Sequence, residues 1–393
     1  MWQIAFQVIP VLAWGLSALV VVRPLALPRR SALLAIAALG VAFGKFAFFA
    51  IAGGNGFTPI LPPLVIWSYG CVYGAAMLLT MLSFAAALFD GAAGAFHRPV
   101  SVRVRRVRCL VLVAVAAAAA LWGIWEGVRT PQVRRIEIAC PGLPQSFDGY
   151  RIVHLSDLHC SPSARRVRFE KIVRRVNALK PDLVAITGDF VDGTVADRRG
   201  DLSPLADLCA KDGVFGCTGN HEAYWECERW LAALNEMGVA FPEKAGAAVI
   251  RRGGDALAVG ALADPAVRMW LMGLPEWGAA ADAFAGAPAG AFRILLFHRP
   301  VAELVDSAGA DVRLQLSGHT HGGAMPVLRT IIEHRHEGHS RGIYEFAPGR
   351  FLHVSPGTGQ WAGFPLRLFT PAEITELVLR AAPPGVSPRR AAP

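Results

Sequence analysis

Leu183-Val184-Ala185-Ile186-Thr187-Gly188-Asp189-Phe190-Val191-Asp192-Gly193 is the stretch that decides the fold of this chain. Its first five residues are apolar or β-branched, which is typical of a short buried strand. Glycine and two carboxylates follow at once, so Asp189 and Asp192 lie on the loop at the carboxyl end of that strand. Open α/β sheets bind ligands at this end of their strands. The stretch therefore predicts an α/β fold with a polar site at one sheet edge.

Four further apolar runs end in the same way, at residues 155, 217, 297 and 316. The polar side chains that follow them are Asp157, His159, Asn220, His221, His298, His319 and His321. Carboxylate, imidazole and amide groups of this kind bind borderline divalent metals. One such cluster would mean little, but five that converge on one rim offer ligands for two ions. We therefore expect a dinuclear hydrolase.

The motifs and their order resemble the calcineurin-like metallophosphoesterase superfamily. They are D-x-H at 157–159, GDxxDG at 188–193, GNHE at 219–222, a lone histidine, and GHTHGG at 318–323. The resemblance covers about Tyr150 to Leu379. Residues 365–368, Pro-Leu-Arg-Leu, are similar to the end of a branch that includes membrane-associated bacterial phosphodiesterases. Ala324 departs from that branch, which often carries glutamine there, and this concerns the substrate rather than the metals.

The resemblance implies a four-layer α/β sandwich, with two packed mixed sheets flanked by helices. It also implies roles for the site residues. Asp157, His159 and His321 would hold one metal, Asn220, His298 and His319 the other, and Asp189 would bridge both. His221 would protonate or stabilise the leaving oxygen, and Asp192 would orient His221. The ions would be two divalent metals from the set Mn, Fe, Zn, Co and Ni, and a bridging hydroxide activated by them would attack phosphorus.

The composition changes near Arg129. Before it lie four long apolar runs, Ile4–Val22, Leu33–Ala52, Leu64–Leu88 and Leu110–Ile124. A helix that spans a bilayer needs roughly 20 apolar residues. We therefore expect an all-α transmembrane region of four helices at 1–127, a linker and first strand at 128–146, a metallophosphoesterase domain at 147–380 and a disordered, Pro/Ala/Arg-rich tail at 381–393.

The patterns predict a first strand before the domain, and three helices and two late strands within it. These are Arg135–Ala139, then Arg165–Leu179, Ala223–Met237 and Val301–Ala308, then Gly342–Phe346 and Phe351–Val354.

Arginine residues orient the membrane region. The loops after the first and third apolar runs carry eight of them, at 23, 29, 30, 98, 103, 105, 106 and 108, whereas the 53–59 loop carries no charge. By the positive-inside rule both basic loops are cytoplasmic. The chain is then a multi-pass protein of the inner or plasma membrane, and its catalytic domain faces the periplasm or the cell exterior.

The net charge of +9 fits a protein beside an anionic bilayer. The catalytic part lacks a basic stripe interleaved with aromatics, so nucleic acid is not an expected partner. We expect hydrolysis of a phosphodiester or pyrophosphate bond in a lipid or lipid-linked substrate. One alternative is a phosphoesterase on small soluble phosphoesters whose spans are only an anchor. The other is a sensor or transporter that binds metal or phosphate without turnover.

Overall fold

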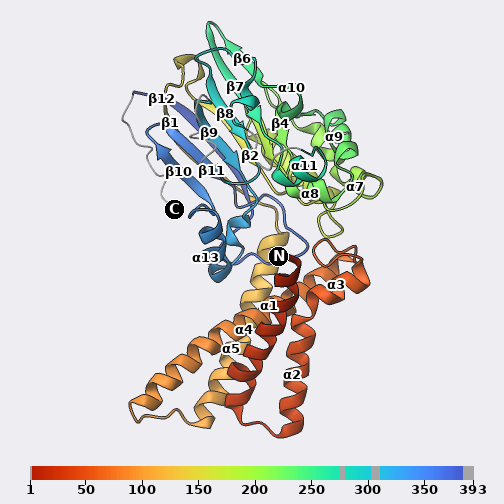
Figure 1. The fold of residues 1–393 in the computed structure, drawn as a ribbon, viewed down its shortest axis with the longest axis vertical. Coiled ribbons are helices and arrows are strands. Elements are labelled where there is room, and N and C mark those ends of the chain that lie inside the picture. Colours follow the sequence, from red (N-terminus) through yellow and green to blue (C-terminus); the bar gives the residue numbers. More distant parts are fainter. Residues whose placement is uncertain (1, 274–278, 302–309, 384–393) are drawn as a thin grey trace. The chain divides into compact units, whose positions relative to one another are not determined.

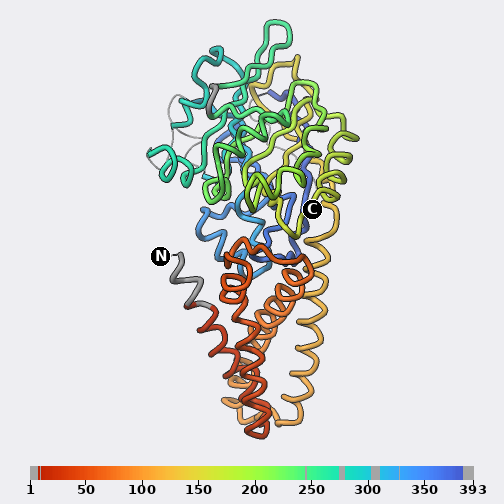
Figure 2. The backbone as a smooth tube through the Cα atoms, turned by 90° about the vertical axis from the view of Figure 1, so that its right-hand side faces the viewer, coloured from red at the N-terminus to blue at the C-terminus, as the bar shows by residue number. Residues whose placement is uncertain are grey.

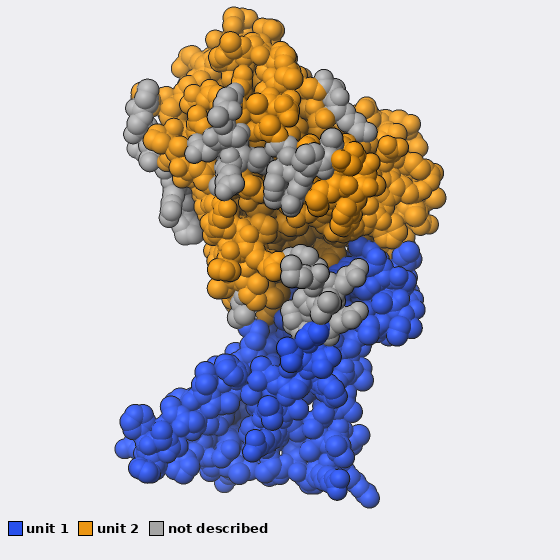
Figure 3. Space-filling model, in the orientation of Figure 1, with its two compact units in different colours: residues 1–128, 362–368 blue, residues 129–361, 369–393 orange. Residues whose placement is uncertain are grey.

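The computed structural model describes residues 2–273, 279–301 and 310–383. The chain divides into two compact units, shown in different colours in Figure 3. The helical unit comprises Met1–Val128 and Ala362–Leu368, and the catalytic unit comprises Arg129–Trp361 and Phe369–Pro393. The chain therefore passes from one unit to the other after residues 128, 361 and 368. The helix expected at Val301–Ala308 falls almost entirely outside the described residues.

Five α-helices form most of the helical unit. They are α1 (Trp2–Ser17), α2 (Arg29–Phe43), α3 (Lys45–Gly53), α4 (Pro63–Ala95) and α5 (Val102–Val128), with short π and 3₁₀ segments at Ala18–Val22 and Arg23–Leu25. In both Figure 1 and Figure 2, α4 and α5 lie side by side. Proline occurs in α4 only at its first residue, where it disrupts no intrahelical hydrogen bond.

Two helices, α4 and α5, are long and apolar enough to cross a membrane. A third crossing results if α2 and α3, which meet at a 55° bend, count as one span. The remaining apolar helix in the described chain, Pro10–Leu25, is shorter than a full span. Membrane association is thus supported, and the count of four spans stays a prediction.

The catalytic unit contains two six-stranded mixed sheets. The first has the order β1-β12-β2-β3-β4-β5, and the second has the order β10-β11-β9-β8-β7-β6. The first sheet consists of β1 (Gln132–Pro141), β12 (Glu373–Ala382), β2 (Tyr150–Leu155), β3 (Leu183–Thr187), β4 (Val214–Cys217) and β5 (Val239–Ala240). The second consists of β10 (Gly342–Ala347), β11 (Arg350–Val354), β9 (Val312–Ser317), β8 (Phe292–Leu296), β7 (Asp255–Ala261) and β6 (Ala248–Arg252).

The apolar strands are explained by burial on both faces. Alternate residues of a strand point to opposite faces of its sheet. Ile152, Leu183 and Ala185 join the core between the two sheets, which also contains Ile294 and Leu314 from the second sheet. Their neighbours along the same strands, which are Val153, Leu155, Val184 and Ile186, pack instead under helices on the outer face. The predicted pair of packed mixed sheets with helices is confirmed.

The outer helices of the first sheet are α6 (Arg166–Ala178), α7 (Val195–Leu202), α8 (Asn220–Tyr224) and α9 (Cys227–Glu236). Further helices are α10 (Pro242–Ala245), α11 (Pro265–Trp270) and α13 (Pro326–Arg335).

Two expectations about elements were wrong in detail. The single helix expected at Ala223–Met237 is two helices, because Trp225 is extended and the adjacent Glu226 carboxylate accepts a hydrogen bond from the Val195 amide at 2.8 Å. Ala381 and Ala382, expected in the tail, pair with β1, and the expected tail from residue 384 on lies outside the described residues.

Candidate metal centre and active site

The predicted ligands lie at the carboxyl ends of five neighbouring strands. β2 leads into Asp157 and His159, β3 into Asp189, and β4 into Asn220. In the second sheet, β8 leads into His298, and β9 into His319 and His321. Because β2, β3 and β4 are mutually parallel, as are β8 and β9, their ends meet at a common edge.

The backbone at these loops adopts unusual conformations. Asp157, His159, Asp189, His319 and His321 all have positive φ, between 45° and 70°. Non-glycine residues rarely adopt this region, and such residues concentrate at functional sites. Gly188 is needed for a close approach, because a Cβ at this position would lie 2.7 Å from the backbone of Gly219. In these conformations the polar side chains lie together at the carboxyl ends of the strands.

Donor atoms converge in three overlapping groups, within 4.8 Å of one another in each. The groups are Asp157, His159 and His321; His159, Asp189 and His221; and Asp189, His298 and His319. The Asp189 Oδ2 atom lies 3.3 Å from His298 Nε2 and 3.7 Å from His159 Nε2. Asp189 therefore stands between a histidine of the first predicted ligand set and a histidine of the second.

Asn220 provides an independent test of whether the residues fit a metal. Its side-chain nitrogen donates to the Tyr224 hydroxyl at 3.3 Å, while its buried Oδ1 atom has no hydrogen-bond partner in the described part of the chain. A buried amide oxygen without a partner is costly. A divalent cation would satisfy it, so the donor set fits the metals that the family normally binds.

The buried carboxylates of the site produce a negative potential that raises the pKa of nearby histidines and favours cations, and a histidine gives up its proton when it binds a metal. Burial lowers the pKa of His298, but the Asp189 carboxylate more than compensates and raises it to about 10. In the same way burial lowers the pKa of His221, and Asp189 and Asp192 raise it to about 9. Burial and the nearby Arg299 charge keep the pKa of His319 well below its usual value, so this imidazole stays neutral, as a metal ligand must.

Hydrogen bonds on the far side of the predicted histidine ligands fix the orientation of their rings. His298 Nδ1 donates to the Thr187 carbonyl at 2.8 Å, which leaves Nε2 facing Asp189. His159 Nδ1 donates to Asp192 Oδ2 at 3.1 Å. Such outer partners fix the tautomer of a metal-binding histidine. His221 Nδ1 contacts the other oxygen of Asp192, at 2.5 Å.

Three residues near the site were not assigned a role from the sequence. Glu222 accepts backbone hydrogen bonds from Asp189, Phe190 and Gly219, at 2.6–3.0 Å. The rings of Tyr224 and Trp361 lie 5.1 Å and 6.2 Å from the His221 ring. Glu222 is the last residue of the GNHE motif, so the sequence could have indicated a role for its carboxylate. Nothing local to Trp361 indicates that it reaches the site.

The family model for calcineurin-like phosphoesterases matches residues 150–323. A metallophosphoesterase of Aquifex aeolicus is 31% identical over 260 residues, which are 63% of this chain and 92% of that protein. The chain belongs to the calcineurin-like phosphoesterase family. It therefore carries the domain of a phosphoric ester hydrolase, as the motifs predicted.

Among members of the calcineurin-like phosphoesterase family, a zebrafish (Danio rerio) protein described as a transmembrane protein with metallophosphoesterase domain is 34% identical over 68% of this chain and 62% of its own length. A cattle (Bos taurus) protein of the same description is 32% identical over 70% of this chain and 63% of its own. The chain thus spans a little under two thirds of these relatives. A 5′-nucleotidase precursor structure from Thermus thermophilus covers 60% of this chain and 56% of its own, with 16% identity and a TM-score of 0.29.

Proposed function

We propose that this protein is a dinuclear, metal-dependent phosphoesterase that hydrolyses a phosphodiester or pyrophosphate bond of a membrane-borne substrate. The observation that carries the dinuclear assignment is the position of Asp189, whose Oδ2 atom lies 3.3–3.8 Å from three histidines. Asp157, His159 and His321 would hold one ion, Asn220, His298 and His319 the other, and Asp189 both. When bound, two such ions supply Lewis-acid stabilisation of phosphoryl charge and a water of lowered pKa.

His221 performs the proton transfer that the leaving group needs. Its ring is buried against Asp192, which accepts from Nδ1 and leaves Nε2 to face the metal centre. A carboxylate on one ring nitrogen fixes the tautomer and favours the protonated form. A protein that only senses metal or phosphate needs ligands but no such acid, so this pair favours turnover over sensing.

The membrane-borne substrate is supported by an apolar surface near His221. Tyr224 packs against the His221 ring, and Trp270 packs against Tyr224 with ring centroids 5.6 Å apart. Trp270 belongs to an exposed apolar run with Met269, Leu271 and Met272, and these residues are 40–60% exposed. Exposed apolar patches mark binding surfaces, and tryptophan favours the lipid–water interface. The aromatic path would receive the apolar part of a lipid phosphoester.

The test replaces this surface and leaves the metal ligands intact. The Trp270→Ser/Leu271→Ser variant should lose roughly tenfold or more of its activity on phosphatidyl lipids and lipid pyrophosphates in vesicles, because burying one such side chain contributes about 1.5–3 kcal/mol. Hydrolysis of bis(p-nitrophenyl) phosphate should hardly change. Val167→Ser, also at an exposed apolar residue, is the control. If wild type cleaves soluble diesters but no lipid, the small-phosphoester alternative holds.

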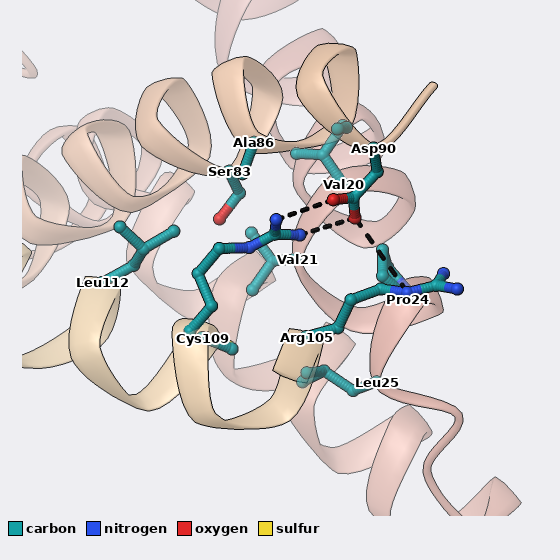
Figure 4. A pocket seen from close by; sticks show the side chains of 12 residues that line it. Val20, Val21, Pro24, Leu25, Ser83, Ala86, Asp90, Arg105, Cys109 and Leu112 are labelled. Carbon is teal, nitrogen blue, oxygen red and sulfur yellow. Dashed lines mark hydrogen bonds and ion pairs between the residues drawn. The ribbon is translucent and has the colours of Figure 1, made fainter. Parts of the chain in front are cut away.

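We further infer that the protein is multi-pass and that its catalytic domain lies outside the cytoplasm. Arg106, near the start of α5, donates to the carbonyls of Leu25 and Ala26 at 2.8 and 3.0 Å. The two arginine-rich loops therefore share one end of the helical unit. Asp90 accepts a bidentate hydrogen bond from Arg108 and lies 4.0 Å from Arg105 (Figure 4). Loops that share an end and an excess of arginine are expected on the cytoplasmic side.

A further inference from the structure

Residues 362–368, Ala-Gly-Phe-Pro-Leu-Arg-Leu, interrupt the catalytic unit in the sequence and belong to the helical unit. We call them the inserted segment. Ala362, Leu366, Arg367 and Leu368 are each at most 3% exposed. A connection between two strands usually runs over the surface. The inserted segment is instead buried, and its contacts with the helices explain why.

Three helix glycines form the seat of the inserted segment. A Cβ on Gly70 of α4 would lie 2.5 Å from Pro365 Cγ, and one on Gly123 of α5 would lie 2.9 Å from Leu366 Cγ. Gly74, one turn beyond Gly70, meets Leu366 in the same way. The Arg367 amide also donates to the Gly123 carbonyl at 3.0 Å. Glycine inside a helix costs about 0.5–1 kcal/mol relative to alanine, so its presence at all three contacts indicates that the close approach matters.

Lys45 of α3 holds the other end of the inserted segment. Its side chain is fully buried and donates to the Gly363 carbonyl. The ammonium also lies over the rings of Phe46, Tyr73 and Phe364, with centroids 4.0, 4.8 and 5.7 Å away. Burying an ammonium is costly without such partners, and no ion pair involves Lys45 among the described residues. The carbonyl and the aromatic rings together account for its burial.

The residue that precedes the inserted segment is Trp361, whose ring meets the His221 ring edge-on at 83°. One peptide bond joins Trp361 of the catalytic unit to Ala362 of the inserted segment. We propose that α3, α4 and α5 position Trp361 through the inserted segment, and that Lys45, Gly70 and Gly123 are therefore positioning residues for phosphoester hydrolysis. This inference rests on the proposed hydrolysis at His221 but not on the lipid substrate.

The test is a double-mutant cycle on the full chain, with a soluble alkyl phosphodiester as the probe, because its poor leaving group depends on the proton from His221. Gly70→Ala is the sharpest variant, because the rigid Pro365 ring cannot turn away from the added methyl group. A displacement of about 1 Å in an active site can lower the rate 10²-fold. We therefore expect kcat to fall about ten- to a hundredfold, with KM and metal content little changed. Gly91→Ala, in the same helix but with no atom within 4 Å, is the matched control.

In a Trp361→Ala background, Gly70→Ala should change kcat less than twofold, because residues that act through one contact are not additive. An equal loss in both backgrounds, or no loss in either, overturns the proposal. Lys45→Met should reproduce the Gly70→Ala pattern from a different helix.

Trypsin gives a second readout that does not depend on activity. Arg367 is 2% exposed, so wild type and Gly91→Ala should resist cleavage after it, while Gly70→Ala should be cut there. Equal cleavage in wild type would refute the docking itself. If wild type cleaves the soluble probe but no vesicle lipid, the lipid assignment fails and the cycle still decides this inference.

Discussion

At the scale of single residues, the ionisation state of the buried Asp189 carboxylate matters most for the site. Burial raises the pKa of Asp189, but the charges of His298, His221 and His159 outweigh burial and hold this pKa well below its usual range. The carboxylate is therefore ionised and ready to be shared by two cations. It also accepts the His221 amide at 2.8 Å, so the same side chain organises the loop that carries the proposed acid.

Asp189→Ala should abolish hydrolysis and remove most of the bound metal, because each proposed ion loses a ligand and the repulsion between the two ions is no longer offset. Metal analysis of purified protein should give near two divalent ions for wild type. Asp207→Ala, at an exposed carboxylate remote from the motifs, should match wild type. A fully loaded and active Asp189→Ala protein would exclude the dinuclear assignment.

His221→Ala should keep its metal and lose turnover by roughly 10²–10⁴-fold, the usual contribution of a general acid. The loss should shrink with nitrophenyl esters, since that leaving group needs little protonation. Kinetics on matched alkyl and nitrophenyl diesters test this, with metal content measured in parallel. Equal losses on both would show that His221 orients the phosphoryl group instead.

The convergence of the proposed ligand side chains on one site could be predicted, because each follows an apolar run and belongs to a recognisable motif. What could not be predicted is how one residue serves two others. Asp192 was expected to orient His221, yet it also accepts from His159, since the two rings lie only 4.6 Å apart in the fold. Trp361 comes from a connection 140 residues later in the chain than His221 (361 − 221 = 140), and no local pattern reports such a distant contact.

At the scale of elements, Glu222 joins two strand ends. Glu222 lies on α8, which follows β4. Its carboxylate accepts hydrogen bonds from the amides of Asp189 and Phe190, which follow β3. The bond to Gly219 closes the turn into its own helix. Hydrogen bonds to a carboxylate are stronger than those to neutral acceptors, so one side chain fixes the spacing between the bridging ligand and Asn220.

Glu222→Gln should weaken metal binding by about 10–100-fold, the usual effect of changing a partner behind the ligands. The amide has one acceptor oxygen and cannot replace both carboxylate oxygens. Titration of metal-free protein, followed by calorimetry, measures the change. Glu228→Gln, on the exposed side of α9, should bind metal as wild type does. Unchanged affinity in Glu222→Gln would show that the backbone alone fixes this spacing.

The strands that carry motifs were predictable from their apolar runs, whereas β6, β7 and β12 were not. β12 includes Glu373, Thr375 and Glu376, which dilute its apolar pattern, and its partner β1 lies more than 200 residues earlier. The helix break at Trp225 has no glycine or proline to signal it, because a side-chain contact with Val195 produces it. Local sequence thus predicts elements that are stable by composition and misses those that depend on distant pairing.

At the scale of the whole molecule, we expect the arginine-rich loops to lie on the cytoplasmic side of the membrane. An alkaline phosphatase reporter fused after Arg129 should be active, and one fused within residues 98–108 should be inactive, because this reporter folds only outside the cytoplasm. A fluorescent protein that requires the cytoplasm should give the reverse pattern. The opposite result for both reporters would move the catalytic domain, and the search for its substrate, into the cytoplasm.

The placement of β12 has a consequence for how the chain is made. β12 lies between β1 and β2, and the inserted segment just before it completes the packing of α4 and α5. During synthesis the amino-terminal parts emerge first and begin to fold. Neither unit can complete its packing, however, until residues 362–382 have been made. A chain that terminates early therefore leaves an open sheet edge and an unfilled helix seat at the same time. Proteases could cleave such truncated chains at either location. Both units therefore need the complete chain in order to fold.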